Sequence, residues 1–154
     1  MTKRIIRSLV CIVIVAGALA TIAAPANAAA GGTDRPWKGV GSVNGTVILG
    51  SPIRVSAVGT VTVTHLGRSA YSNMVVCSPT GCANGTTSVT IVAANGDTVF
   101  GRGVITNGAT RVTITGGTGR FAGASGYYNV AGTAVFDSGL TFTLAFTQTG
   151  AVSY

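Results

Sequence analysis

The feature that most constrains the fold is a strict two-residue alternation close to the C-terminus. From Leu140 to Thr147, leucine and phenylalanine at even positions alternate with threonine and alanine at odd positions. A period of two places successive side chains on opposite faces of a β-strand, whereas an amphipathic helix requires a period near 3.6 residues. The segment 140–152 is therefore predicted to be a strand with one apolar and one polar face.

The same β pattern extends over most of the chain. Threonine and valine, which favour the pleated surface of a sheet, dominate from Trp37 onward. Glycine and asparagine interrupt the pattern at short intervals, and Asn95-Gly96 and Asn107-Gly108 are favoured two-residue hairpin turns. The sequence predicts short antiparallel strands at 38–49, 56–66, 69–77, 86–93, 98–105, 111–115, 127–136 and 140–152.

The edges of such a sheet need protection from pairing with other chains. Charged residues that block edge pairing are scarce, because Asp, Glu, Lys and Arg make up only 8% of the chain. Closing the sheet into a barrel removes the edges altogether. We therefore expect an all-β fold, a single eight-stranded antiparallel β-barrel over residues 37–154, with a β-sandwich as the alternative.

The first 28 residues have the pattern of a secretory signal peptide. Three basic residues precede an apolar run from Leu9 to Ala24, and Ala26-Asn27-Ala28 matches a cleavage signal. The run is short for a membrane span and lacks basic residues on its far side. We expect cleavage near Ala28, a flexible segment over 29–36, and a secreted protein of bacterial type with no membrane partner after cleavage.

The charge of the chain does not indicate a nucleic-acid surface. Without the three basic residues of the signal, seven basic residues stand against three aspartates, a net charge of +4. These seven are scattered singly, whereas a nucleic-acid surface clusters them on one face. We expect no nucleic-acid partner, and the sequence does not specify the oligomeric state.

Two cysteines remain in the expected mature chain. Cys77 and Cys82 flank a turn-forming Ser-Pro-Thr-Gly segment, which in an exported protein predicts a local disulfide. Two cysteines without a nearby histidine or acid cannot complete a zinc site, and a redox motif has two intervening residues rather than four. No metal or other cofactor is expected.

Residues for catalysis are few. The chain has one histidine, three aspartates and no glutamate, and it lacks the Gly-x-Ser-x-Gly motif of an activated serine. The candidates for a ligand site are His65, Tyr71, Arg102 and Tyr128. His65 either lines the barrel with Val61 and Val63 or is hydrogen-bonded at the end of its strand. Arg102, which alternates with Phe100 and Val104, either points from a barrel mouth or binds an anionic group.

A glycine-rich corner lies between the sixth and seventh predicted strands. It contains Gly116, Gly117, Gly119, Phe121 and Gly126. Glycine adopts positive φ without steric cost, and the one large apolar residue can anchor the corner to the core. The spacing is not that of a dinucleotide-binding loop, and no Gly-Lys-Ser/Thr of a P-loop is present.

The corner Gly116-Gly117-Thr118-Gly119-Arg120-Phe121, with Ala124, Gly126 and Tyr127, resembles the glycine corner of plant dirigent proteins. The segments Asn95–Thr98 and Gly101-Arg102 are similar to the region before that corner, and allene oxide cyclases carry a related corner. The resemblance implies an eight-stranded antiparallel barrel whose interior holds an apolar small molecule. Ser125 stands where dirigent proteins usually carry a basic residue.

These features leave three functional hypotheses. The first is a secreted barrel that binds a hydrophobic or aromatic small molecule without transforming it. The second is a dirigent-type or cyclase-type enzyme, such as an isomerase, that steers a reactive intermediate. The third is an extracellular structural module that contacts a polymer or protein through its outer face. We favour the first, because the second needs an inward acid or base and the sequence makes such groups scarce.

Overall fold

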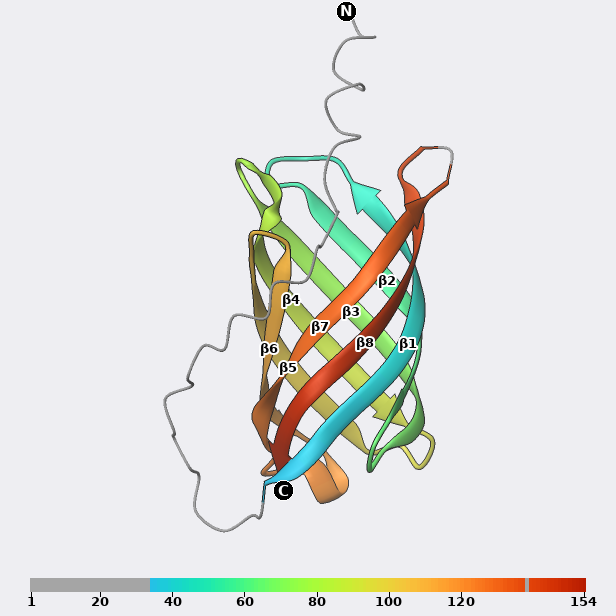
Figure 1. Cartoon of the computed structure of the whole chain (residues 1–154), viewed down its shortest axis with the longest axis vertical. Helices are drawn as coiled ribbons and strands as arrows, with labels where there is room; N and C mark the ends of the chain where they lie inside the picture. The colour runs from blue at the N-terminus through green and yellow to red at the C-terminus, as the bar shows by residue number, and fades with distance from the viewer. Residues whose placement is uncertain (1–33, 138) are drawn as a thin grey trace, which may run out of the picture.

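The computed structural model describes residues 34–137 and 139–154, which form a closed antiparallel β-barrel (Figure 1). The fold class predicted from the sequence is confirmed, and the β-sandwich alternative is wrong. A short 3-10 helix, η2 (Gly119–Phe121), lies between the sixth and seventh strands. The strands are β1 (Arg35–Ile48), β2 (Arg54–Val63), β3 (Gly67–Ser78), β4 (Gly81–Ala93), β5 (Thr98–Thr106), β6 (Ala109–Gly117), β7 (Ser125–Phe136) and β8 (Thr141–Ser153).

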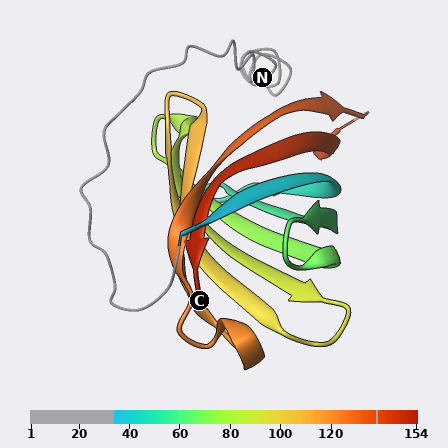
Figure 2. The ribbon, with the colours of Figure 1, turned by 60° about the horizontal axis from the view of Figure 1, so that its bottom comes forward.

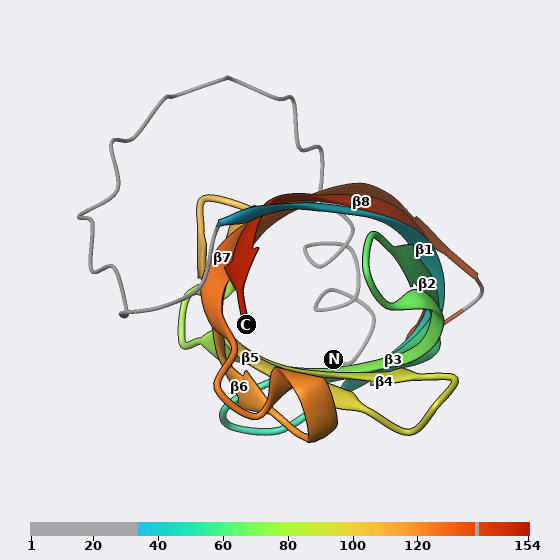
Figure 3. The same ribbon diagram turned by 90° about the horizontal axis from the view of Figure 1, so that it is seen from below.

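Closure of the barrel depends on the first and last strands. Each strand pairs with the next one in the chain, and β1 pairs with both β2 and β8. The ring of strands is visible from below in Figure 3. Because every strand has two neighbours, no backbone edge is left open, as the scarcity of charged residues indicated.

The register of the ladders shows that the strands are strongly tilted. If each residue is followed to its ladder partner on the next strand around the barrel, the path that begins at Trp37 returns to β1 at Val47, ten residues further along the strand. It passes Gly150, Tyr128, Val112, Gly103, Thr87, Val75 and Val55. An eight-stranded barrel with such a stagger has an interior wide enough for packed side chains or one small ligand.

The two ends of the barrel differ in their connections (Figure 1). The end that carries the β2–β3 turn, the β4–β5 hairpin and the corner containing η2 is called the lower end. The upper end carries the β1–β2, β3–β4, β5–β6 and β7–β8 connections. The chain therefore runs from the lower to the upper end in β1, β3, β5 and β7, and from the upper to the lower end in the other four strands.

Aromatic rings in the interior lie over glycines of neighbouring strands. A Cβ added to Gly41 would lie 2.8 Å from Cζ of Phe146, and one added to Gly45 would overlap the ring of Phe142. Gly41 pairs with Phe146, and Gly45 pairs with Phe142, across the β1–β8 ladder. Glycine on the inner face thus makes room for a ring from the next strand, which fills the narrow barrel.

Several boundaries differ from the predicted ones. β1 begins at Arg35, and β4 begins at Gly81 rather than Thr86, because the hairpin closed by the disulfide continues the ladder to the pair Ser78 and Gly81. β2 ends at Val63, before His65.

The predicted signal peptide, residues 1–28, lies outside the described residues. Within the described ranges, no helix is long and apolar enough to cross a membrane.

Candidate functional site

Two of the four predicted ligand residues face the barrel interior. Tyr71 on β3 is 6% exposed and Tyr128 on β7 is 1% exposed. The ring of Tyr128 stacks on Trp37 with centroids 5.2 Å apart, and the ring of Tyr71 packs on Phe146 at 5.1 Å. Both tyrosines therefore belong to the inner wall.

His65 does not line the barrel. It lies in the β2–β3 turn with φ of 74°, and its side chain is exposed. The amide of Leu66 donates to the carbonyl of Val63 at 3.2 Å, which closes the turn and ends the alternation that places Val61 and Val63 inside. The interpretation in which His65 lines the barrel together with Val61 and Val63 is therefore wrong.

Arg102 lies on the outer face of β5. Its neighbours Phe100 and Val104 share that face and are exposed. The buried face of this strand instead carries Gly101 and Gly103, over which side chains of other strands pack. The face that the sequence offered as a ligand face is thus the outer one, and the inner face of β5 carries Val99 and Ile105 on either side of the two glycines.

The lower half of the barrel is sealed by large side chains. Trp37, Tyr128 and Gln148 are each at most 1% exposed. The indole Nε1 of Trp37 donates to Oε1 of Gln148 at 3.0 Å, within the stack of Trp37 on Tyr128. Phe121 of the corner is fully buried, as expected for an anchor.

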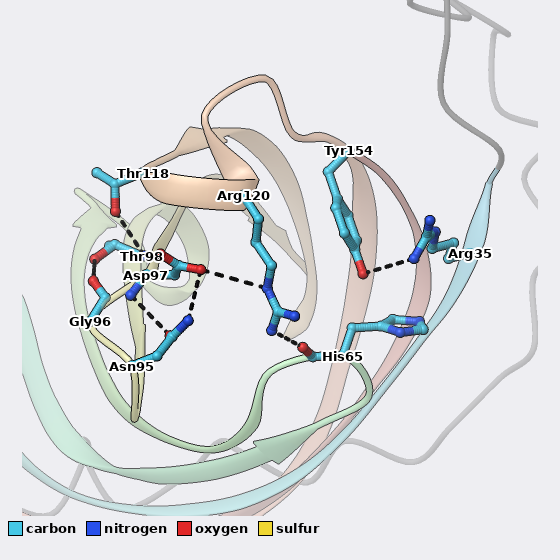
Figure 4. Close-up of polar contacts among 9 residues, drawn as sticks. All are labelled: Arg35, His65, Asn95, Gly96, Asp97, Thr98, Thr118, Arg120 and Tyr154. Atoms are coloured by element: carbon cyan, nitrogen blue, oxygen red, sulfur yellow. Dashed lines mark hydrogen bonds and ion pairs between the residues drawn. The ribbon is translucent and has the colours of Figure 1, made fainter.

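A network of contacts at the lower end holds the glycine corner in place (Figure 4). The guanidinium of Arg120 donates to the carbonyl of His65 and lies 3.6 Å from a carboxylate oxygen of Asp97. Asn95 donates to the same carboxylate at 2.9 Å. Tyr154 packs edge-on against Phe121, with ring centroids 4.7 Å apart. The corner is therefore tied to two neighbouring turns and closes this end.

The upper half of the interior is partly open. Six of its inward-facing apolar side chains are only half-buried, and we call this set the upper wall. Inside a closed barrel, such exposure reaches solvent through the open end. The upper wall consists of Val47, Val55, Val75, Val130, Ala134 and Leu144.

Buried polar atoms without partners lie below and beside the upper wall. Among the described residues, no hydrogen-bond partner is found for Asn73 Oδ1, Thr87 Oγ1, Tyr128 OH or Gln148 Nε2. Thr87 is the ladder partner of Val75, which belongs to the upper wall, and Asn73 precedes Val75 by two residues on β3. Buried polar groups are usually paired, so these four atoms offer one acceptor, one donor and two hydroxyls to an incoming molecule.

Burial keeps the two interior phenols in their neutral form. Desolvation raises the pKa of Tyr71 well above its ordinary value. Desolvation also raises the pKa of Tyr128, and the neighbouring phenol of Tyr71 raises it further. Both side chains therefore keep a hydroxyl proton to donate at neutral pH.

Charged groups stand on the outside of the barrel. The aspartates, lysines and arginines of the described part of the chain are exposed or half-buried, and only Arg35, at the start of β1, shares the inward register of the strands. Arg111 stacks on the outer ring of Tyr127, 3.9 Å from the ring centroid. In residues 34–137 and 139–154, no cluster of three metal-ligating side chains is present. The described interior thus offers neutral hydrogen-bonding groups and apolar side chains.

Cys77 and Cys82 are joined in a disulfide at the upper end, as predicted. Cys77 is buried and follows Val75 on the inner face of β3. The bond fixes the β3–β4 hairpin at the rim of the upper wall. A shallow groove of about 220 Å³ lies on the outside of β2, β3 and β4, with Val58, Met74 and Asn73 among its lining residues. Serines and threonines make up most of the rest of its lining, which offers little apolar enclosure.

The sequence interpretation missed Trp37, Asn73, Thr87 and Gln148. Gln148 follows Phe142, Leu144 and Phe146 at every second position, on the inward face of β8. A polar residue in a series of apolar inward positions was the sequence signal that could have identified it. Asn73 between Tyr71 and Val75 carries the same signal.

Comparison with known proteins places the fold among dirigent-like barrels. No family model and no curated protein matches the sequence. A pterocarpan synthase dirigent protein superposes with a TM-score of 0.55 at 12% identity, covering 79% of this chain and 86% of that one. A pyocyanin demethylase superposes with a TM-score of 0.50 at 15% identity, covering 74% of this chain and 99% of that one. The resemblance expected from the glycine corner is confirmed for the fold.

Proposed function

We propose that this protein binds a small hydrophobic or aromatic molecule in the upper half of the barrel. The observation that carries the proposal is the half-exposed apolar upper wall next to buried polar atoms that lack partners. An apolar enclosure with a few directed polar groups is the usual composition of a small-molecule site. The apolar wall supplies affinity, and the polar atoms orient the ligand.

The polar groups favour a ligand with at least one hydrogen-bond acceptor. The hydroxyl of Tyr128 stays protonated and has no partner among the described residues, so it is free to donate. Asn73 Oδ1 accepts, and the hydroxyl of Thr87 does either. A planar ring with a carbonyl or phenol substituent satisfies both the wall and these atoms.

Binding is favoured over the cyclase-type alternative. The two similar structures are named as a pterocarpan synthase dirigent protein and a pyocyanin demethylase, and their low identity supports the fold only. The described interior offers phenols whose raised pKa values suit hydrogen bonding better than proton transfer near neutral pH. We therefore assign the interior to recognition of a neutral ligand.

A neutral fluorescent probe tests the proposal. N-phenyl-1-naphthylamine is titrated into the purified protein, and its emission is expected to saturate at one probe per chain. Ala134→Trp fills the upper wall and is expected to abolish binding, whereas Arg102→Ala, on the outer face, leaves it unchanged. Circular dichroism and the melting temperature verify the fold of each variant.

Methyl NMR of the unaltered protein supplies a second readout that needs no substitution. The probe is expected to shift the methyl signals of Val47, Val55 and Val130 and to leave those of Val63, in the sealed half, in place. Absence of saturable binding, or shifts confined to the outer groove at Val58 and Met74, overturns the proposal.

A further inference from the structure

Exposed apolar side chains concentrate at one place on the rim of the upper end. Of the eleven large apolar residues exposed in the described chain, five come from the end of β1 and the β7–β8 hairpin. We call this set the apolar lip. It consists of Ile48, Leu49, Val135, Phe136 and Leu140, with exposed fractions from 39% for Leu140 to 65% for Val135.

The two segments of the apolar lip are held side by side. The amide of Val47 donates to the carbonyl of Leu140 at 2.7 Å, which extends the β1–β8 ladder past Thr46 and Thr141. The ring of Phe136 packs on Phe142 with centroids 5.4 Å apart. Figure 1 shows the β7–β8 hairpin at the top of the barrel, beside the end of β1, and Figure 2 shows it reaching outward at the end of the sheet.

The apolar lip is continuous with the interior. Val47 and Phe142 lie on the inner face directly beneath it, and Phe136 continues the inward series of β7. The other exposed large apolar side chains are distributed over the outer faces of β1 to β5. A gathered apolar set at a rim is the kind of surface that contacts a lipid or a protein, whereas single exposed residues are ordinary.

The charges around the apolar lip decide between these partners. Arg54 is exposed and pairs across the ladder with Ile48, which places a positively charged residue beside the lip, suited to anionic lipid phosphates. Asp137 in the hairpin is the one acid beside it in the described chain. The lip is a small projecting edge of apolar side chains rather than a broad flat face. A projecting apolar edge with an adjacent arginine fits the interface of a lipid layer better than the flat surface of a protein.

We propose that the apolar lip docks the upper end of the barrel on a lipid surface. In this position the mouth of the barrel faces the lipid layer. The proposal departs from the sequence-based expectation of no membrane partner after cleavage, which could not take account of the lip because its two segments lie far apart along the chain. The inference does not depend on ligand binding, since the lip is an outer surface that exists whether or not the interior is occupied.

Site-specific tryptophans test this docking. Leu49→Trp places an indole in the apolar lip, and Val40→Trp places one on the outer wall of β1 at nearly equal exposure, 60% against 61%. With vesicles of equimolar phosphatidylcholine and phosphatidylglycerol, Leu49→Trp is expected to shift its emission to the blue and to be quenched by brominated lipid. Val40→Trp is expected to do neither. Trp37 is fully buried and adds the same background emission to both variants, so the difference between them reports on the introduced indoles.

Charge variants test the orientation. Arg54→Gln is expected to weaken binding of Leu49→Trp to these vesicles, and Asp137→Asn to strengthen it. Replacing Leu49, Phe136 and Leu140 together by serine is expected to lower vesicle affinity at least about tenfold. Absence of a shift for Leu49→Trp, or an equal shift for Val40→Trp, overturns the proposal. A shift that follows protein concentration without vesicles overturns it in favour of self-association.

Discussion

The indole N–H of Trp37 and the side-chain oxygen of Gln148 form a buried hydrogen bond, 3.0 Å long, between the first and last strands of the barrel. The bond joins residues on the two strands that close the sheet, in a layer where neither side chain reaches solvent. It also orients the amide so that its nitrogen is left without a partner among the described residues.

Gln148→Met is expected to destabilise the protein by about 1–3 kcal/mol, because the indole N–H is then buried without an acceptor. Urea denaturation measures the loss. Combining this change with Trp37→Phe tests the pair, and a coupling of about 0.5 kcal/mol or more is expected for residues in contact. Strict additivity of the two changes contradicts a contribution from the bond. Thr149→Val, on the opposite face of β8, serves as the control and is expected to have little effect.

Gly45→Ala is expected to cost about 1–3 kcal/mol, because the new methyl group overlaps the ring of Phe142. The melting temperature measures the effect. Phe142→Leu in the same chain is expected to recover part of the loss. Gly123→Ala, where nothing lies within 4 Å of the added Cβ, is the matched control. Equal losses for both glycines indicate that backbone freedom rather than ring packing sets the requirement for glycine.

Arg120→Lys is expected to loosen the glycine corner while changing global stability by about 1 kcal/mol or less, since the Arg120–Asp97 pair is partly exposed. A lysine ammonium lacks the planar fork that reaches both Asp97 and the carbonyl of His65. Hydrogen exchange measures the effect. Faster exchange is expected at the amides of Phe121, Ala122 and Ala124, which bond within the corner. Unchanged exchange at these amides contradicts a role for Arg120 in holding the corner.

Stability is expected to fall above about pH 10 because of the two interior tyrosines. Their pKa values are raised in the folded state, so the unfolded chain releases phenolic protons that the folded protein retains. Stability is therefore intact below the unfolded pKa and declines above it, by about 1.4 kcal/mol per pH unit for each tyrosine. Urea denaturation at a series of alkaline pH values measures the slope, and Tyr71→Phe is expected to halve it. A slope unaffected by Tyr71→Phe assigns the decline to other groups.

The fold was predictable because its main signal is local. The alternation from Leu140 to Thr147 identifies a strand without reference to the rest of the chain, and the same holds for the hairpin turn at Asn95-Gly96. The disulfide was predictable for the same reason, since Cys77 and Cys82 are close in sequence. Barrel closure followed from the scarcity of charged residues at potential edges.

The interior site was only half predictable, because the inward face of a strand is decided by its neighbours. β5 shows the difficulty most clearly. Phe100, Arg102 and Val104 lie on its outer face, whereas Gly101 and Gly103 face inward because side chains from other strands occupy the space above them. His65 was misplaced because a turn residue at positive φ interrupted an alternation that otherwise continued.

The pairing of β1 with β8 links completion of the fold to the last part of the chain. Until residues 141–153 are available, one side of β1 and one side of β7 have no partner. A chain shortened before β8 would therefore present two strands with one unpaired edge each to other copies of itself. By pairing with both strands, β8 removes the two edges on which aggregation would begin.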